Sequence, residues 1–354
     1  MAAMFSRRAL IGPIVLVLLV VAGYPAYWFY AKGIAEDAFA RWVEARRAEG
    51  YEVAHGPAEV GGFPMLIRLR VPDPAIAAPD RRWRWRGAAA RLEMQPWDFH
   101  RYRLEFTGTH TFQVRTDAGP RSYMAEALEA FAIARFHGNG RLADLGLSIT
   151  ELSVDRVGAR ESKGSEALTL RQARLDVGRA ETSPAGHTEK SLDLSLIAED
   201  VHLAAAKLPL GGVVPKVRLV AEVMGALSDV SPAALQAWRK AGGTIEVPWL
   251  NIAWGPLDLR AKGTVALDEE LRPLGALTAD IRGYGETLSA LADAGVMRRD
   301  VASAGRITLD LLAQPSKDDG RRVLTVPLTA QDGGFYVGPI RALTLPPVVP
   351  PAAN

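Results

Sequence analysis

Alternation of apolar and polar side chains with a period of two dominates the chain beyond residue 50. It occurs in the runs 65–71, 83–86, 101–106, 217–223, 257–267 and 324–330. Such alternation is typical of strands with one buried and one wet face, and hence of antiparallel sheet. The runs 168–177 and 192–203 change parity, which predicts a β-bulge or a bend. The expected fold class is mainly β (α+β), with an extended, curved antiparallel sheet or, as the alternative, a sandwich.

Three to four short helices are predicted to interrupt the sheet. Helical spacing of apolar residues covers 123–136, and shorter helical patterns cover 286–294 and 300–312. Ser231 and Pro232 have the form of an N-cap and a first helical residue, and the glycines at 242–243 form a stop signal.

An uncharged stretch, residues 9–31, precedes these elements. As a helix its 23 residues would reach about 34 Å, enough to cross a bilayer core. Arg7 and Arg8 precede it, so the positive-inside rule places residues 1–8 in the cytoplasm and the rest outside. A cleaved signal peptide is the alternative, but its apolar run should span only about 7–15 residues and end in small residues. We therefore expect a single-pass anchor in a bacterial inner membrane with a periplasmic C-terminal domain.

The remaining chain divides by composition. Residues 32–49 are predicted to form an amphipathic linker helix that either docks on the following domain or lies on the membrane surface. A β-rich domain is expected over 50–344, and a proline-rich tail over 345–354. The turn-rich gap at 178–191 suggests two possible halves, 50–178 and 191–344.

Composition and charge exclude several classes of protein. The chain has 42 basic and 40 acidic side chains and no cysteine. The near balance argues against a nucleic-acid binder, and the lack of cysteine excludes disulfides, thiolate metal sites and a catalytic thiol. Arg7, Arg8 and Lys32 give residues 1–32 a charge of +3, so the net +2 leaves 2 − 3 = −1 for the remainder.

The sequence contains no recognisable catalytic motif, cofactor-binding motif or metal-binding motif. No two histidines have a metal-binding spacing. The segment 138–143 loosely matches a dinucleotide-binding pattern, but it follows a run of helical period, so a helix C-cap with a glycine turn is the better interpretation. The chain is therefore expected to be non-enzymatic.

One apolar strand face offers a binding hypothesis. If no second layer covers it, the face forms an apolar groove; if one does, the same residues are core. The candidate lining residues are Trp83, Trp85, Tyr102, Leu104 and Phe106.

Several segments together resemble the domain-of-unknown-function 2125 family, found mostly in alphaproteobacteria. They are Gly62-Phe63-Pro64, Pro74, Trp85, the segment 92–97, LDEELRPLGALTADIRGY at 267–284, and QDGGFYVGPIRALTLPP near the end. The resemblance implies a membrane-anchored, β-rich envelope protein with no assigned activity. The layout of the C-terminal part is also similar to the AsmA-like superfamily, associated with lipid traffic. The family-motif positions, expected to be structural, are Gly62, Phe63, Pro64, Pro96, Trp97, Asp268, Pro273, Gly338 and Pro339.

Taken together, these features predict a membrane-anchored periplasmic module that binds a lipid or another apolar ligand. The alternative is a structural or assembly factor that binds other envelope proteins without a small ligand.

Overall fold

The computed structural model describes residues 7–116, 119–158, 166–204, 208–315, 320 and 322–349, with backbone alone for residues 7–22, 166 and 340. These residues form antiparallel strands and four helices, and the chain divides into two compact units, Met1–Tyr123 and Met124–Asn354. The expectation of a mainly β, antiparallel protein is confirmed.

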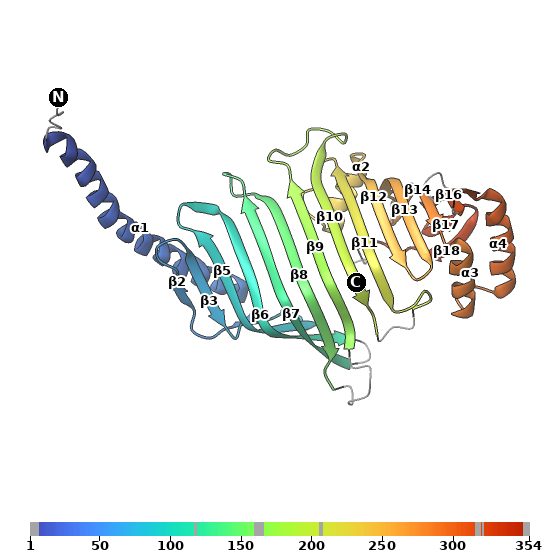
Figure 1. The fold of residues 1–354 in the computed structure, drawn as a ribbon, viewed down its shortest axis with the longest axis horizontal. Coiled ribbons are helices and arrows are strands. Elements are labelled where there is room, and N and C mark those ends of the chain that lie inside the picture. The colour runs from blue at the N-terminus through green and yellow to red at the C-terminus, as the bar shows by residue number, and fades with distance from the viewer. Residues whose placement is uncertain are drawn as a thin grey trace, which may run out of the picture. The chain divides into compact units, whose positions relative to one another are not determined.

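Unit 1 consists of one long helix and a small antiparallel sheet (Figure 1). The elements are α1 (Arg7–Ala48), β1 (Glu52–Ala54), β2 (Glu59–Gly61), β3 (Ile67–Pro72), β4 (Ala75–Ala77), β5 (Trp83–Gln95) and β6 (Asp98–Thr116). Strand β5 is the hub, because it pairs with β3, β4 and β6, while β2 pairs with β3 and β1 with β4.

Helix α1 contains both the predicted span at 9–31 and most of the predicted linker helix without interruption. Its C-terminal part docks on unit 1: Val43 is buried, and Arg47 donates two hydrogen bonds to the Val53 carbonyl oxygen at 2.9 and 3.2 Å. The C-terminal part of α1 therefore lies against the sheet of unit 1, while Ile34 and Trp42 of the predicted apolar stripe stay exposed. Within the described part of the chain, no helix is both long and apolar enough to cross a membrane. The side chains of residues 9–22 in the predicted span lie outside that part.

Unit 2 is built on a meander. Its strands are β8 (Leu142–Arg156), β9 (Glu166–Arg179), β10 (Lys190–His202), β11 (Val213–Met224), β12 (Thr244–Trp254), β13 (Leu257–Leu267), β14 (Pro273–Arg282), β15 (Gln314–Pro315), β16 (Arg322–Gln331), β17 (Gly334–Val337) and β18 (Ile340–Thr344). From β8 to β14 each strand pairs with the next, and β16, β17 and β18 follow. These strands form one sheet, not a sandwich. The gap at 178–191, considered as a domain boundary, connects the paired strands β9 and β10.

Three short helices belong to unit 2: α2 (Pro232–Lys240), α3 (Tyr284–Asp293) and α4 (Arg299–Leu312). They confirm the helices predicted near 232, 286–294 and 300–312. The Ser231 hydroxyl accepts a hydrogen bond from the Ala234 amide at 3.3 Å, so the expected N-cap is present.

One predicted helix is wrong. Residues 123–136 belong to strand β7 (Gly119–Phe136), and residues 138–140 therefore turn between strands and do not cap a helix. Along β7, Met124 and Leu128 are exposed whereas Tyr123, Ala125 and Ala127 are half-buried, which is the alternation of a strand. The alanine-rich segment fits both periods, and pairing within the sheet overrides helix propensity.

The parity change predicted within 192–203 arises from a bend. Asp200 has a left-handed φ of 51°, while the pairing of β10 with β9 keeps one register from Glu199 to His202. Glu151 in β8 has a φ of 47°. Both residues lie level with Arg171 of β9, where regular strand pairing is interrupted on both sides. The sheet thus bends at one row without an inserted residue.

Candidate functional site

Cross-strand rows of aliphatic side chains are the main apolar feature of the unit 2 sheet. One row runs through Leu147, Leu175, Leu196, Leu219 and Leu250. The rows two residues away on the same face contain Leu145, Val177, Leu194 and Ala221 on one side, and Ile149, Ala173, Ala198, Val217 and Ile252 on the other. Because alternate residues of a strand share a face, these rows form one apolar surface.

Burial along this surface increases from one end to the other. Leu147, Leu175 and Leu196 are only half-buried. In the same row farther on, Ala261, Ala279 and Val326 are buried. The buried end is covered by α3 and α4, whose residues Tyr284, Leu288 and Leu309 join β13, β14 and β16 in one hydrophobic cluster.

At the other end of the surface, no described helix covers the strands. None of the hydrophobic clusters formed by the described residues contains a residue of β8, β9 or β10. From β8 to β11 the open surface is about 14 Å wide across the strands. We call it the open leucine face, defined by Leu145, Leu147, Ile149, Leu175, Val177, Leu194, Leu196 and Leu219.

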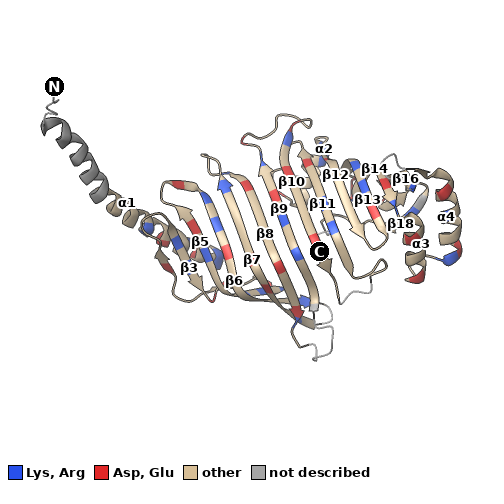
Figure 2. Ribbon diagram, in the orientation of Figure 1, with Lys and Arg blue, Asp and Glu red and all other residues tan. Residues whose placement is uncertain are grey.

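The opposite face of the same strands is polar. Rows such as Ser148, Arg174, Ile197 and Arg218 alternate with the leucine rows, and basic and acidic positions intersperse along β9 to β13 (Figure 2). Arg174 pairs with Asp176 at 2.7 Å within β9, and Arg135 pairs with Asp144 at 3.0 Å. Continuous rows of aliphatic side chains therefore lie on one side of the sheet, whereas the other side is mixed, with Ile197 and Val220 among its polar and charged residues.

An ion-pair cluster marks the bend described above. The Arg171 guanidinium donates to Asp200 Oδ2 at 2.6 Å and also to Glu199 Oε2, and Lys216 Nζ lies 3.9 Å from Glu199. These groups lie at exposed or half-exposed positions. The leucine rows therefore end at these charged groups.

In unit 1 the predicted groove residues lie on the paired strands β5 and β6 but differ in environment. Tyr102 packs with Trp28 and Ala31 of α1, so this end of the face is covered by the helix. Trp85 meets Phe106 edge to face, with ring centroids 5.8 Å apart. Trp83 is 38% exposed, and Leu104 is half-buried opposite Leu92. The five residues therefore do not line one continuous groove: Tyr102 packs against the helix, whereas Trp85 and Phe106 contact each other.

His110 lies beside Trp85 and Phe106. Its ring stacks on Trp85 with centroids 5.8 Å apart and an interplanar angle of 8°. Both ring nitrogens are buried, and neither forms a hydrogen bond with a described residue. Burial lowers the pKa of His110 below its ordinary value, because the apolar surroundings disfavour the charged imidazolium.

Five family-motif residues lie in two turns that flank α1. Gly62, Phe63 and Pro64 form the turn between β2 and β3, and Pro96 and Trp97 form the turn between β5 and β6. Three side chains of α1 donate hydrogen bonds to these turns: Tyr24 to the Pro64 carbonyl, Tyr27 to the Pro96 carbonyl, and Trp28 Nε1 to the Leu66 carbonyl at 3.0 Å.

The other motif positions order turns in unit 2. Asp268 accepts hydrogen bonds from the amides of Glu270 and Arg272 at 3.0 and 2.8 Å and pairs with the Arg272 guanidinium at 2.7 Å. Pro273 is the first residue of β14, opposite Leu267. Gly338 has a left-handed φ of 56° and, with Pro339, turns the chain between β17 and β18. The contacts of Asp268 thus order the turn that precedes β14.

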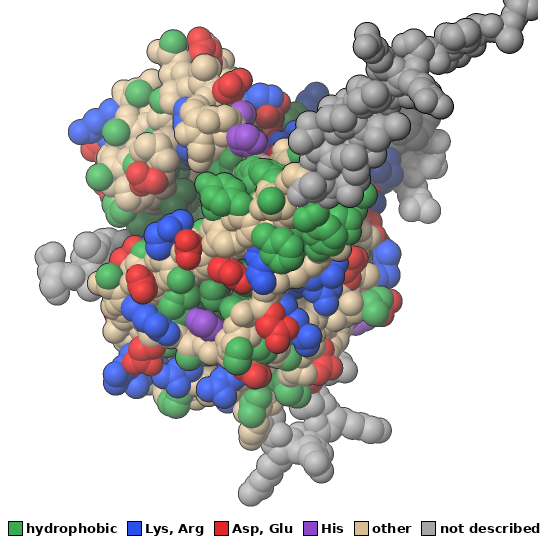
Figure 3. All heavy atoms as spheres, turned by 90° about the vertical axis from the view of Figure 1, so that its left-hand side faces the viewer, with side chains coloured by type: hydrophobic (Ala, Val, Ile, Leu, Met, Phe, Trp, Pro, Cys, Tyr) green, Lys and Arg blue, Asp and Glu red, His purple; other side chains and the backbone are tan. Residues whose placement is uncertain are grey.

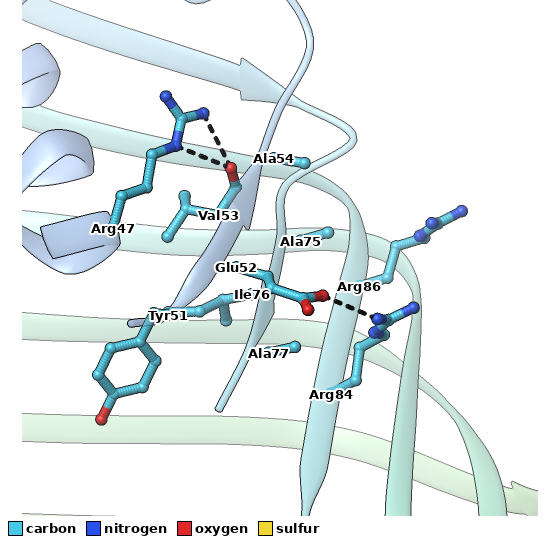
Figure 4. Close-up of a pocket in the computed structure, with 10 residues that line it drawn as sticks. All are labelled: Arg47, Tyr51, Glu52, Val53, Ala54, Ala75, Ile76, Ala77, Arg84 and Arg86. Atoms are coloured by element: carbon cyan, nitrogen blue, oxygen red, sulfur yellow. Dashed lines mark hydrogen bonds and ion pairs between the residues drawn. The ribbon is translucent and has the colours of Figure 1, made fainter. Parts of the chain in front are cut away.

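Two hollows lined by both charged and apolar residues are further candidate sites. One, of about 300 Å³, is lined by arginines including Arg47 and Arg84, and Glu52 binds Arg84 at 3.0 Å within it (Figure 4). The other, of about 480 Å³, contains Tyr284, whose hydroxyl donates to Asp310 at 2.7 Å. Burial, followed by the bond to Asp310, raises the pKa of Tyr284, which stays a protonated donor. Among the described residues no group of three or more potential metal ligands occurs.

The alternation within 168–177, 192–203 and 217–223 predicts half-buried strands but not the open leucine face. Its signal is a row of large aliphatic residues in consecutive strands with no apolar helix assigned to cover them. The aromatic residues around Trp85 are instead the lining predicted for an apolar groove, but their rings pack on one another.

Comparison with known proteins places the chain by family alone. No curated protein and no solved structure matches it. The model of the family described as "Uncharacterized protein conserved in bacteria (DUF2125)" matches residues 28–346. That match takes in both units, their strands and the two motif turns, and the chain belongs to this family.

Proposed function

We propose that this protein is a membrane-anchored module that holds the acyl chains of a lipid on the open leucine face of unit 2. The observation that carries the proposal is the row of Leu147, Leu175, Leu196 and Leu219, which is half-buried and lies under no described element. A sheet face of this kind normally packs against a second layer, because each buried aliphatic side chain contributes about 1.5–3 kcal/mol.

The chemistry of the face favours acyl chains over polar ligands. The eight residues that define it offer only aliphatic groups, and the charged residues of the same strands alternate with them, lie at the bend or, like Arg179, lie beyond the last row. An acyl chain needs no hydrogen-bond partner, so it can cover such a surface without leaving polar groups unsatisfied.

The anchor and location are part of the proposal. Residues 9–31 carry no charge, and Arg7 and Arg8 lie on their N-terminal side. These features support an inner-membrane anchor with the β units on the periplasmic side, where a module that binds lipid would meet its ligand.

Photo-crosslinking tests the proposal. The full chain is expressed in bacteria fed a fatty acid that bears a diazirine in its acyl chain, and after irradiation the labelled peptides are mapped by mass spectrometry. Label on peptides from β8 to β11 is expected. Leu196→Asn should remove most of this label, whereas Ile197→Asn, a change on the opposite face of the same strand, should leave it unchanged.

Two outcomes would overturn the proposal. One is lipid label confined to residues 9–31 while β8 to β11 stay unlabelled. The other is a protein captured by the same face in place of lipid, which would favour an assembly factor. Circular dichroism of both variants shows whether each still folds.

A further inference from the structure

The two motif turns of unit 1 present a group of exposed apolar side chains beside α1. Phe63 and Met65 extend from the β2–β3 turn, and Trp97 from the β5–β6 turn; each is more than half exposed, at 52%, 63% and 56%. Phe29 and Tyr30 of α1 are exposed too, and the Phe29 ring stacks on Phe63 at 6.4 Å. Hydrophobic side chains gather beside the grey N-terminal segment in Figure 3.

Charge is absent from this surface and begins at its edges. Neither 61–67 nor 94–97 contains a charged residue, and Arg68 and Asp98 follow directly. Arg68 is neutralised by an ion pair with Glu93. A monomeric domain rarely exposes several large apolar side chains side by side unless they meet a partner or a membrane.

The position of these turns along α1 identifies the partner. A bilayer core about 30 Å thick takes about 20 helical residues, which from Ala9 end near Trp28. Tyr24, Tyr27 and Trp28 are the residues that hydrogen-bond to the two turns. Because α1 is continuous from Arg7 to Ala48, the turns are attached where the helix would leave the hydrocarbon.

We propose that the two turns form a lipid-facing foot, defined by Phe29, Tyr30, Phe63, Met65 and Trp97, that inserts into the interfacial layer of the bilayer. Aromatic side chains and an apolar methionine suit this layer, where rings meet headgroups at one end and acyl chains at the other. The foot rests on the anchor proposed above. Unit 1 then contacts the membrane at three places, helix α1 and the two turns.

Fluorescence quenching in membranes tests the foot. The chain has no cysteine, so single-cysteine variants of the full chain can be labelled with an environment-sensitive dye. Met65→Cys, Leu311→Cys on α4 and Val17→Cys in the apolar segment are compared in nanodiscs of phosphatidylethanolamine and phosphatidylglycerol, with and without lipids brominated near the headgroup end of the acyl chain. Nanodiscs with one chain each are used.

The Met65→Cys label should emit at shorter wavelength and lose most of its intensity to brominated lipid. The Leu311→Cys label, on a side chain that is 83% exposed in unit 2, should lose none. A Met65→Cys label that behaves like the Leu311→Cys label overturns the foot, provided that the Val17→Cys label is shielded from soluble quencher.

If the Val17→Cys label is instead open to soluble quencher, the anchor itself fails. Nanodiscs that hold two chains test contact with a second copy. If unlabelled Met65→Cys chains form disulfide-linked dimers in these discs, and the label on Met65→Cys is shielded only in them, the surface contacts a second copy of the chain and its insertion into lipid is overturned.

Discussion

The indole of Trp28 donates its hydrogen bond to the Leu66 carbonyl oxygen, 3.0 Å away and 38 residues later in the chain. Trp28 is 3% exposed, and its ring also meets Phe63 edge to face at 5.5 Å. This single side chain therefore fastens the β2–β3 turn to α1 by both a polar and an apolar contact.

Trp28→Phe should loosen that turn while keeping most of the ring packing. The Leu66 carbonyl would lose its partner, which costs about 1–3 kcal/mol when the group stays out of water. Hydrogen exchange measured by mass spectrometry should show faster exchange over residues 59–70. The matched control is Trp42→Phe, on the same helix at a side chain that is half exposed; equal protection in the two variants would refute the fastening role.

The pH dependence of stability should report His110. Burial in the fold lowers the pKa of His110. When the pH falls below the ordinary histidine pKa of about 6.5, the imidazole is therefore protonated in the unfolded chain but still neutral in the folded chain. Stability therefore falls as the pH drops through that value toward the folded-state pKa. In His110→Gln the melting temperature should fall less between pH 7.5 and 5, whereas His100→Gln, at an exposed position, should follow the parent chain.

Gly263 should not tolerate a side chain. A β carbon there would lie 2.3 Å from the Ala276 carbonyl oxygen on the paired strand β14. Relieving that overlap requires the two strands to separate, so Gly263→Ala should destabilise the protein by about 3 kcal/mol. Gly138→Ala provides the control, because nothing lies within 4 Å of its added carbon. Urea unfolding compares them, and similar midpoints would contradict the close approach.

Two leucines on the same sheet face should respond differently to truncation. Leu324 is fully buried beneath the helices of unit 2, so Leu324→Ala should cost about 2–5 kcal/mol. Leu196 lies on the open leucine face and is already half-exposed, so Leu196→Ala should cost roughly 1 kcal/mol. An equal loss in urea unfolding would mean that the leucine face is covered in solution.

Local signals in the sequence predicted those elements that local physics decides. Ser231 and Pro232 specify a helix start by their own geometry, and the alternation at 257–267 specifies a half-buried strand without reference to its partners. Residues 123–136 were misassigned because alanine is compatible with both periods. Pairing with the neighbouring strands β6 and β8 settles the choice, and the pattern within residues 123–136 contains no trace of that pairing.

The candidate site was less predictable for a similar reason. Alternation states that a residue such as Leu175 turns toward the apolar side, but not whether a helix covers that side. The cover over Leu259 and Leu324 comes from α3 and α4, whose placement depends on the turn at Gly283. Whether an apolar face is core or binding surface is therefore decided by tertiary packing, which no pattern of residues 168–177 contains.

The order of strands in unit 2 has a consequence for how this sheet comes into being. From β9 to β14 each strand pairs with the strand synthesised just before it. No strand in that series waits for a distant segment, which keeps the entropy of loop closure small. The sheet can grow strand by strand as the chain is delivered, with a single growing edge open to misassembly at any moment.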